Sequence, residues 1–199
     1  MTAAPSIGRE RNAQTNERRT RALDAFIDLV LEHGTHPRPE AVAQRADVSI
    51  ASLYRYFTDL AELRQDAAAR LMERFPELFL VAEIGVGERN ERIESFTASR
   101  MALHDALHPL QLLARAKSWE DPSAKLDLEA VRSVMTEQIR QHFEAELQTV
   151  SRTVAEDVAT TIAVLTSVES WDQFRSQQRT PVQTRRAWTE AIDRLLPRP

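Results

Sequence analysis

The sequence predicts an all-α fold, and three observations support this. Only four glycines occur in 199 residues, and none of them interrupts a periodic segment. Apolar residues recur at three- and four-residue spacing between prolines, and no stretch alternates apolar and polar residues with period two. We therefore expect helices over residues 16–33, 40–46, 50–56, 59–75, 88–108, 110–118, 123–148, 151–176 and 182–196.

The first three segments predict a helix-turn-helix. The helix over residues 16–33 should end at Gly34, and Pro39 suits a first helical position, where its missing N–H costs nothing. Asp47 follows where the chain must reverse, and Asp tolerates a left-handed conformation. Ser49 can then cap the next helix. A joint of about three residues between two short helices is typical of this motif.

The helix over residues 50–56 predicts a surface that reads DNA. Leu53 and Phe57 share one face at four-residue spacing and should be buried. Small side chains on the other faces let a backbone approach base edges, Tyr hydroxyls can reach phosphates, and Arg can reach phosphate or guanine. Asp59 with Glu62 three residues later predicts the cap of a following helix.

These residues resemble a known family. Val48-Ser49, then Leu53-Tyr54-Arg55-Tyr56-Phe57 and Glu62-Leu63, resemble the DNA-binding domain of the TetR family of bacterial transcriptional regulators, and Arg21 to Gly34 is similar to its opening helix. The resemblance is specific over residues 18–63. Arg38, Asp47 and Ala51 depart from the family pattern. Leu60 stands where the family commonly places a phosphate-binding Lys, which predicts weaker binding and a flatter salt dependence.

The resemblance implies a three-helix DNA-binding head joined to a larger ligand-binding and dimerisation domain. We expect a flexible basic tail over residues 1–15, the head over 16–57 and the helical domain over 58–199. The implied function is a regulator, acting as a repressor that a small-molecule effector releases from near-palindromic double-stranded DNA. The expected DNA-binding residues are Arg18, Arg19, Ser49, Ile50, Ala51, Ser52, Tyr54, Arg55 and Tyr56.

The C-terminal half carries two further expectations. Its last two helices have apolar stripes, which the resemblance assigns to a homodimer interface, although such stripes can also face only their own core. The expected interface residues are Val158, Ile162, Leu165, Trp171, Trp188, Ile192 and Leu195. An effector, mainly apolar, would contact Phe79, Phe96, Met101, His104, His108, Trp119 and Phe143. Bulky apolar residues at helical spacing are, however, more often plain core.

His104-Asp105-Ala106-Leu107-His108 imitates the zinc-protease motif, with two histidines at i and i+4 on one helix face. Asp is a shorter arm than the usual Glu, no third ligand is indicated, and Pro109 should end the helix at once. Histidines near a helix C-terminus are also favoured by the helix dipole. We therefore expect a structural or solvated role, with no metal and no cofactor.

Composition sets the remaining limits. The formal net charge is -4, yet residues 1–21 hold five arginines against two glutamates, so the basic end lies beside the motif. There is no cysteine, and no apolar run approaches the roughly 20 residues that span a bilayer, so a cytoplasmic protein is expected.

No catalytic motif occurs, and we expect no enzyme. The alternative is a helical adaptor that binds protein through Tyr54 and Tyr56.

Overall fold

The computed structural model describes residues 5–198, with the backbone alone for residues 5–11. Every regular element within that range is helical, which confirms the predicted all-α class. Contacts divide the chain into two compact units, one ending at Pro76 and the other beginning at Glu77. The first unit is called the head below, and the second is called the helical domain. None of the helices in the described range combines the length and apolarity of a bilayer span.

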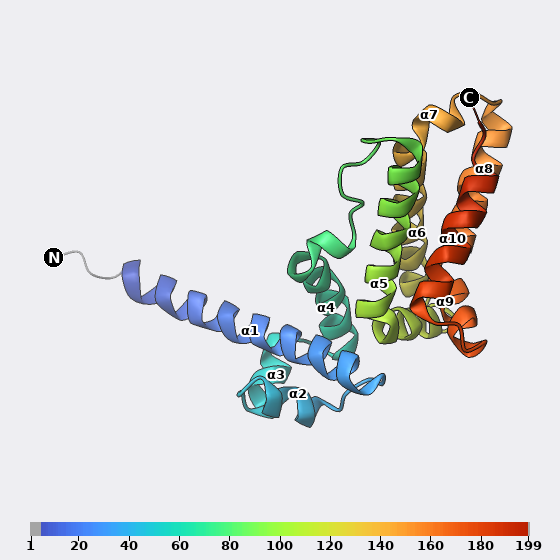
Figure 1. Cartoon of the computed structure of the whole chain (residues 1–199). Helices are drawn as coiled ribbons and strands as arrows, with labels where there is room; N and C mark the ends of the chain where they lie inside the picture. Colours follow the sequence, from blue (N-terminus) through green and yellow to red (C-terminus); the bar gives the residue numbers. More distant parts are fainter. Residues whose placement is uncertain (1–4, 199) are drawn as a thin grey trace. The chain divides into compact units, whose positions relative to one another are not determined.

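The head contains four helices (Figure 1). They are α1 (Pro5–His33), α2 (Pro39–Arg45), α3 (Ile50–Tyr56) and α4 (Leu60–Arg74). The backbone is helical from Pro5, where we expected a flexible tail up to residue 15; the rest of that tail lies outside the described residues. Because α4 packs against α1, the structural unit extends past residue 58, where we had expected the helical domain to begin.

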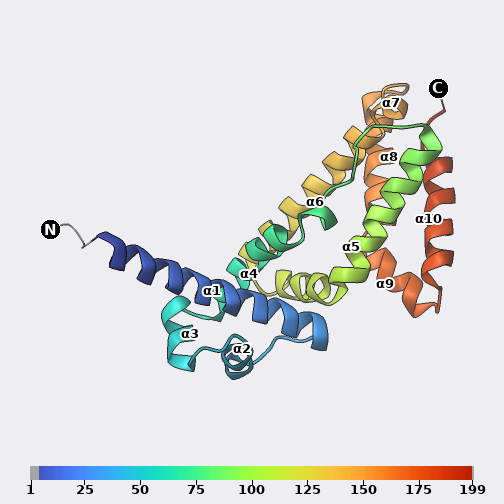
Figure 2. The same cartoon turned by 60° about the vertical axis from the view of Figure 1, so that its left-hand side comes forward.

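The helical domain is a bundle in which α5 packs against α6 and α10, while α8 packs against α6 and α10 (Figures 1 and 2). The shorter α9 lies against α5, and α7 joins α6 to α8. The elements are a 3-10 turn η1 (Pro76–Leu78), α5 (Arg89–Ser118), α6 (Pro122–His142), α7 (Glu144–Leu147), α8 (Arg152–Leu165), α9 (Val168–Ser176) and α10 (Pro181–Leu195).

Three helix boundaries in this domain differ from expectation. Pro109 lies inside α5, so the expectation that it ends a helix is wrong and residues 89–118 form one helix. The proline leaves the carbonyl of Asp105 without its helical donor. The expected helix over 123–148 is broken at Phe143, and the one over 151–176 is broken at Thr166-Ser167. There Ser167 caps α9 by accepting a hydrogen bond from Ser170 N at 3.2 Å.

Two clusters of buried side chains form the core of the helical domain. The larger cluster includes Phe96 on α5 and Phe143 beside α6, whose rings meet edge to face at 5.4 Å between centroids. The smaller cluster contains Met101, Trp171 and Trp188, and the two indole rings lie 6.0 Å apart. The interior between α5, α9 and α10 is therefore lined mainly by aromatic and aliphatic side chains.

Candidate functional site

The turn between α2 and α3 has the geometry that its sequence predicts. Asp47 adopts a left-handed backbone with φ of 54°, and Val48 N donates to the carbonyl of Ala43 at 3.0 Å. Ser49 Oγ accepts from Ser52 N at 3.1 Å and caps α3. These contacts satisfy backbone groups on both sides of the turn and fix the direction in which α3 leaves it.

Helix α3 has one buried face and one exposed face. Leu53 and Phe57 are each 2% exposed, as predicted, while Tyr54 is 53% exposed and Ile50, Ala51 and Arg55 are exposed beside it. The guanidinium of Arg55 donates from Nη2 to Ser52 Oγ at 3.2 Å. Small and hydrogen-bonding side chains therefore share one surface, on the first and last turns of a short helix.

Tyr56 does not belong to that exposed surface. It is 9% exposed, so the expectation that it lies open beside Tyr54 is wrong. Tyr56 follows Leu53 by three residues, and side chains at this spacing lie on neighbouring parts of one helix face. Arg55 instead covers its ring, with the guanidinium carbon 5.6 Å from the ring centroid.

The start of α4 is capped from two sides. Asp59 Oδ1 accepts from Ala61 N at 2.7 Å and from Glu62 N at 2.9 Å. Glu62 reaches back to accept from Thr58 N at 2.6 Å, and this hydrogen bond lowers the pKa of its carboxyl group. The cap predicted from Asp59 and Glu62 is thus confirmed. Leu60, at the first position of this capped helix, is exposed.

Ion pairs bind α4 to α1 within the head. Arg70 Nε pairs with Asp24 at 2.9 Å and Arg74 Nη1 with Asp28 at 2.7 Å. Arg19 pairs with Asp66 and covers the Phe57 ring, with its guanidinium carbon 5.0 Å from the ring centroid. Arg19 therefore has structural partners, whereas Arg18 is exposed. Contact between either arginine and DNA stays a prediction.

The predicted effector residues do not form one group. Phe96 and Phe143 lie in the larger core cluster, and Met101 lies in the smaller one. Phe79 is half-buried before α5, and its carbonyl accepts from Gln138 Nε2 at 2.8 Å. Trp119 is 82% exposed at the C-terminal cap of α5, so it cannot line the same interior as the other side chains.

His104 is buried between the two tryptophans, with ring centroids 6.3 Å from Trp171 and 6.1 Å from Trp188. Its Nε2 lies 2.9 Å from the carbonyl oxygen of Thr166, and its Nδ1 lies 3.0 Å from Gln111 Oε1. Burial lowers the pKa of His104, which keeps the ring neutral.

His108 is placed differently from His104. Its Nε2 lies 3.1 Å from Asp172 Oδ1 on α9, near the surface. Both nitrogens of His104 already have partners within the helical domain. The arrangement agrees with the structural interpretation of the His-Asp-Ala-Leu-His sequence.

The expected dimer residues fall into two sets. Ile162, Trp171, Trp188 and Ile192 are buried within a single chain, so they present no surface to a second copy. Each packs against other helices of its own domain. For these four residues, the apolar stripes therefore face their own core, which was the alternative to a dimer interface. Val158, Leu165 and Leu195 are only partly buried and lie at the edge of these clusters. Dimerisation itself stays a prediction.

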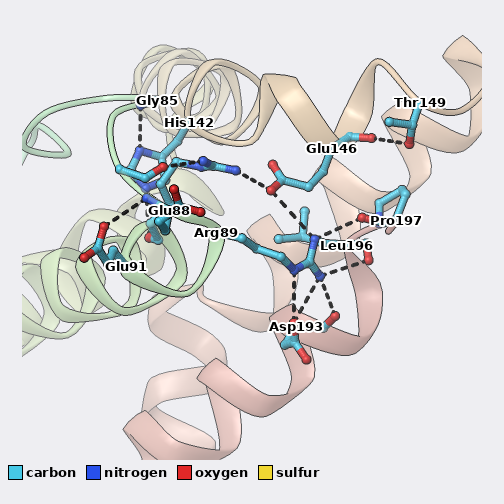
Figure 3. Close-up of polar contacts among 12 residues, drawn as sticks. Gly85, Glu88, Arg89, Glu91, His142, Glu146, Thr149, Asp193, Leu196 and Pro197 are labelled. Atoms are coloured by element: carbon cyan, nitrogen blue, oxygen red, sulfur yellow. Dashed lines mark hydrogen bonds and ion pairs between the residues drawn. The ribbon is translucent and has the colours of Figure 1, made fainter. Parts of the chain in front are cut away.

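Sequence reasoning missed a set of buried and partly buried polar residues in the helical domain (Figure 3). Arg92 pairs with Glu146, and Arg89 holds the end of α10 by donating to the carbonyls of Asp193 at 2.8 Å and Pro197 at 3.0 Å. His142 Nδ1 accepts from Gly85 N at 3.2 Å. A signal was available: Arg92 and Arg100 flank Phe96 at four-residue spacing, on a helix face that is otherwise apolar.

Comparison with known proteins agrees with the geometry of the head. The chain is 43% identical over 76 residues to the HTH-type transcriptional repressor KstR of Rhodococcus jostii, covering 36% of this chain and 35% of that protein. It is 31% identical over 122 residues to the HTH-type transcriptional repressor KstR of Mycolicibacterium smegmatis, covering 60% and 59%. Both relatives are named as helix-turn-helix repressors, which agrees with the helix-turn-helix geometry of the head. No protein-family model matches it.

A solved structure shares the fold over most of the chain. A provisionally assigned transcriptional regulator from Streptomyces coelicolor A3(2) aligns with a TM-score of 0.66 and covers 90% of this chain and 98% of its own. At 22% identity, this likeness concerns the fold alone. The chain spans only 35% and 59% of the lengths of the two repressors named above.

Proposed function

We propose that this chain is a DNA-binding transcriptional repressor that a small-molecule effector releases from its operator. The observation that carries the proposal is the geometry of α3, which exposes Ala51, Tyr54 and Arg55 while Leu53 and Phe57 anchor it in the head. An α-helix with small and hydrogen-bonding residues on its open face fits the major groove. The similarity to two transcriptional repressors supports the same conclusion.

The proposed mechanism uses a homodimer in the cytoplasm. Two copies of α3 about 34 to 36 Å apart would enter successive major grooves of a near-palindromic site. An effector bound in the helical domain would favour a different separation of the heads, so that the dimer no longer matches the groove spacing. Release is then a shift of population between two dimer geometries, caused by the effector's differential affinity for them.

The electrostatics of the head predict moderate affinity. The chain as a whole carries a formal charge of -4, and Leu60 is exposed at the start of α4, where the family commonly has a phosphate-binding Lys. Fewer phosphate contacts release fewer counterions, which makes the salt dependence of binding shallow. Discrimination between sequences depends on base contacts and is not reduced by this loss.

Binding to the DNA adjoining the chain's own gene tests the proposal. Fluorescence anisotropy over a salt series should show tighter binding to this DNA than to a scrambled duplex. Arg55→Ala should weaken binding roughly 10- to 100-fold if Arg55 contacts a base edge. Arg186→Ala is a matched control, because Arg186 is exposed on α10 and only 3.9 Å from Glu190, and we expect it to bind as the wild type does.

The adaptor alternative predicts the opposite result. If neither DNA is preferred and binding does not change with salt, the regulator proposal fails and the exposed Tyr54 becomes a candidate protein contact.

A further inference from the structure

Arg100 is a buried cation without an acidic partner. It lies on α5, is 2% exposed, and forms no ion pair with any acidic side chain of the described residues. Its Nη2 donates to Gln138 Oε1 at 3.0 Å and to the carbonyl of Met135 at 3.2 Å, and its guanidinium covers the Phe96 ring at 4.9 Å. Its Nη1 is equally buried and has no hydrogen-bond acceptor.

The surroundings of Arg100 do not neutralise its charge. Burial lowers the pKa of Arg100 to about 10, which leaves it protonated at neutral pH. The nearby His104 and His142 have pKa values lowered first by burial and further by positive charge, including that of Arg100. Glu146, the buried carboxylate of this domain, pairs with Arg92 instead. A buried charge left uncompensated is strongly unfavourable, so an anion at this position would stabilise the domain.

Other polar atoms of the same interior also have no partner. Thr97 Oγ1 lies one helical turn before Arg100, and Thr184 Oγ1 and Trp188 Nε1 lie on the helix α10 that packs against α5. Trp171 Nε1, beside Trp188, is a further buried donor without an acceptor. In folded proteins about 90% or more of buried polar groups have a partner. Their concentration around α5, α9 and α10 indicates a region suited to a polar group from outside the chain.

We propose that the interior of the helical domain binds an organic carboxylate with an apolar body, whose oxygen accepts hydrogen bonds from Arg100 Nη1 and Thr97 Oγ1. The guanidinium supplies the charge complementarity that a carboxylate requires. Met101 and the two buried tryptophans, which form one cluster, supply the apolar surface for the rest of the molecule. This inference rests on the proposed function in one respect, since it assigns the carboxylate the role of effector.

Direct binding without DNA tests the site. Trp119→Phe leaves Trp171 and Trp188 as the only tryptophans, so their fluorescence reports on the interior. The probes are straight-chain carboxylates from butanoate to decanoate, each compared with its uncharged primary amide. We expect the best carboxylate to bind roughly 10- to 100-fold more tightly than its amide, the factor that a charge-assisted hydrogen bond provides.

Three further substitutions in this background locate the contact. Arg100→Gln should reduce the ratio of carboxylate to amide affinity to about one, and Thr97→Val, which keeps the side-chain volume, should lower it several-fold. Arg140→Gln is the matched control, because Arg140 on α6 already pairs with Glu156 at 2.7 Å, and it should leave the ratio unchanged. Circular dichroism establishes whether each variant is folded. If Arg100→Gln does not fold, the affinity ratio of Thr97→Val tests the contact instead.

Several outcomes would overturn the inference. They are equal binding of carboxylate and amide by the wild-type interior, no binding by any member of the series, and a ratio that survives both the Arg100 and Thr97 substitutions. Because the assay contains no DNA, these results are independent of whether the head binds an operator. Adding the tightest carboxylate to the protein–DNA complex then tests the effector role, and binding without release would overturn that role alone.

Discussion

Tyr56 shows how far residue spacing alone predicts which side chains of α3 are buried. Four-residue spacing placed Leu53 and Phe57 on the inner face, as the structure confirms. Tyr56 was expected to be exposed because its hydroxyl and its neighbours suit a DNA surface. Its burial depends on how α3 packs into the head, which three-residue spacing from Leu53 allows but does not require. The candidate DNA contacts on α3 are therefore limited to its exposed side chains.

The two faces of α3 should respond differently to truncation. Leu53→Ala and Phe57→Ala each remove a fully buried side chain and should lower the free energy of unfolding of the head by about 2 to 5 kcal/mol. Tyr54→Ala removes an exposed side chain and should change stability by less than about 0.5 kcal/mol while weakening DNA binding. Urea denaturation followed by circular dichroism measures this difference. Equal destabilisation by all three variants would contradict the division of α3 into two faces.

The buried histidines predict acid sensitivity of the helical domain. Burial lowers the pKa of His104 in the folded chain, whereas the unfolded chain takes up this proton near pH 6.5. As the pH falls below about 6.5, the unfolded state binds more protons than the folded state, so the free energy of unfolding decreases. Above that pH this group contributes no pH dependence. Measurements between pH 7.5 and 5 should show stability lost as the pH falls towards the lowered pKa of His104.

Replacing His104 separates its contribution from that of His142. His104→Gln removes the titrating ring but keeps a donor for the carbonyl of Thr166, so the pH dependence should become flatter. His33→Gln serves as the control, because His33 is exposed on the last turn of α1, and it should leave the slope unchanged. An identical slope in His104→Gln and the wild type would refute the assignment.

At the scale of elements, most helices could be predicted because their signals are local. Pro39, Ser49 and Asp59 mark helix starts by their own chemistry, and the structure places all three as expected. The breaks at Phe143 and Thr166 carry no Gly or Pro, and Pro109 is tolerated within α5. These features depend on packing against other helices, which a local pattern does not contain.

Pro109 should make α5 less stable than it could be. Pro109→Ala restores the backbone N–H that can donate to the carbonyl of Asp105, and a proline inside a helix costs about 3 kcal/mol. Part of this gain is offset because proline also restricts the unfolded chain by about 0.4 to 1 kcal/mol. We therefore expect the free energy of unfolding of the variant, measured in urea, to be higher by about 2 to 2.6 kcal/mol. A loss of stability would indicate that the packing of α5 requires the proline.

At the scale of the whole molecule, the head was easier to predict than the helical domain. Helices α2 and α3 and their caps lie within 25 consecutive positions, from Arg38 to Glu62, and could be read as one motif. The polar interior of the helical domain joins residues far apart in the sequence, such as Arg92 with Glu146 and Arg100 with Gln138. No local sequence pattern indicates that these positions are in contact. The arginines could therefore be identified from the sequence, but their partners could not.

The proposed dimer can be tested at positions that remain accessible. Val154 is exposed on α8, four residues before the partly buried Val158 on the same face. Val154→Glu should weaken the dimer in analytical ultracentrifugation while leaving the helical content unchanged. Trp171→Glu should instead unfold the helical domain, because it places a charge in the core. If Val154→Glu leaves the dimer intact, α8 does not present this face to a second copy.

The left-handed turn at Asp47 offers a genetic way to separate folding from recognition. Glycine adopts this backbone without the steric cost of a Cβ atom, so Asp47→Gly should stabilise the head by on the order of 1 kcal/mol. As a second-site change, it would partly rescue variants that lose operator binding by unfolding, such as Leu53→Ala. It would give no rescue to Arg55→Ala, in which a contact surface is lost from an intact head. Rescue by Asp47→Gly, or its absence, would therefore distinguish variants that unfold the head from variants that lose a contact surface.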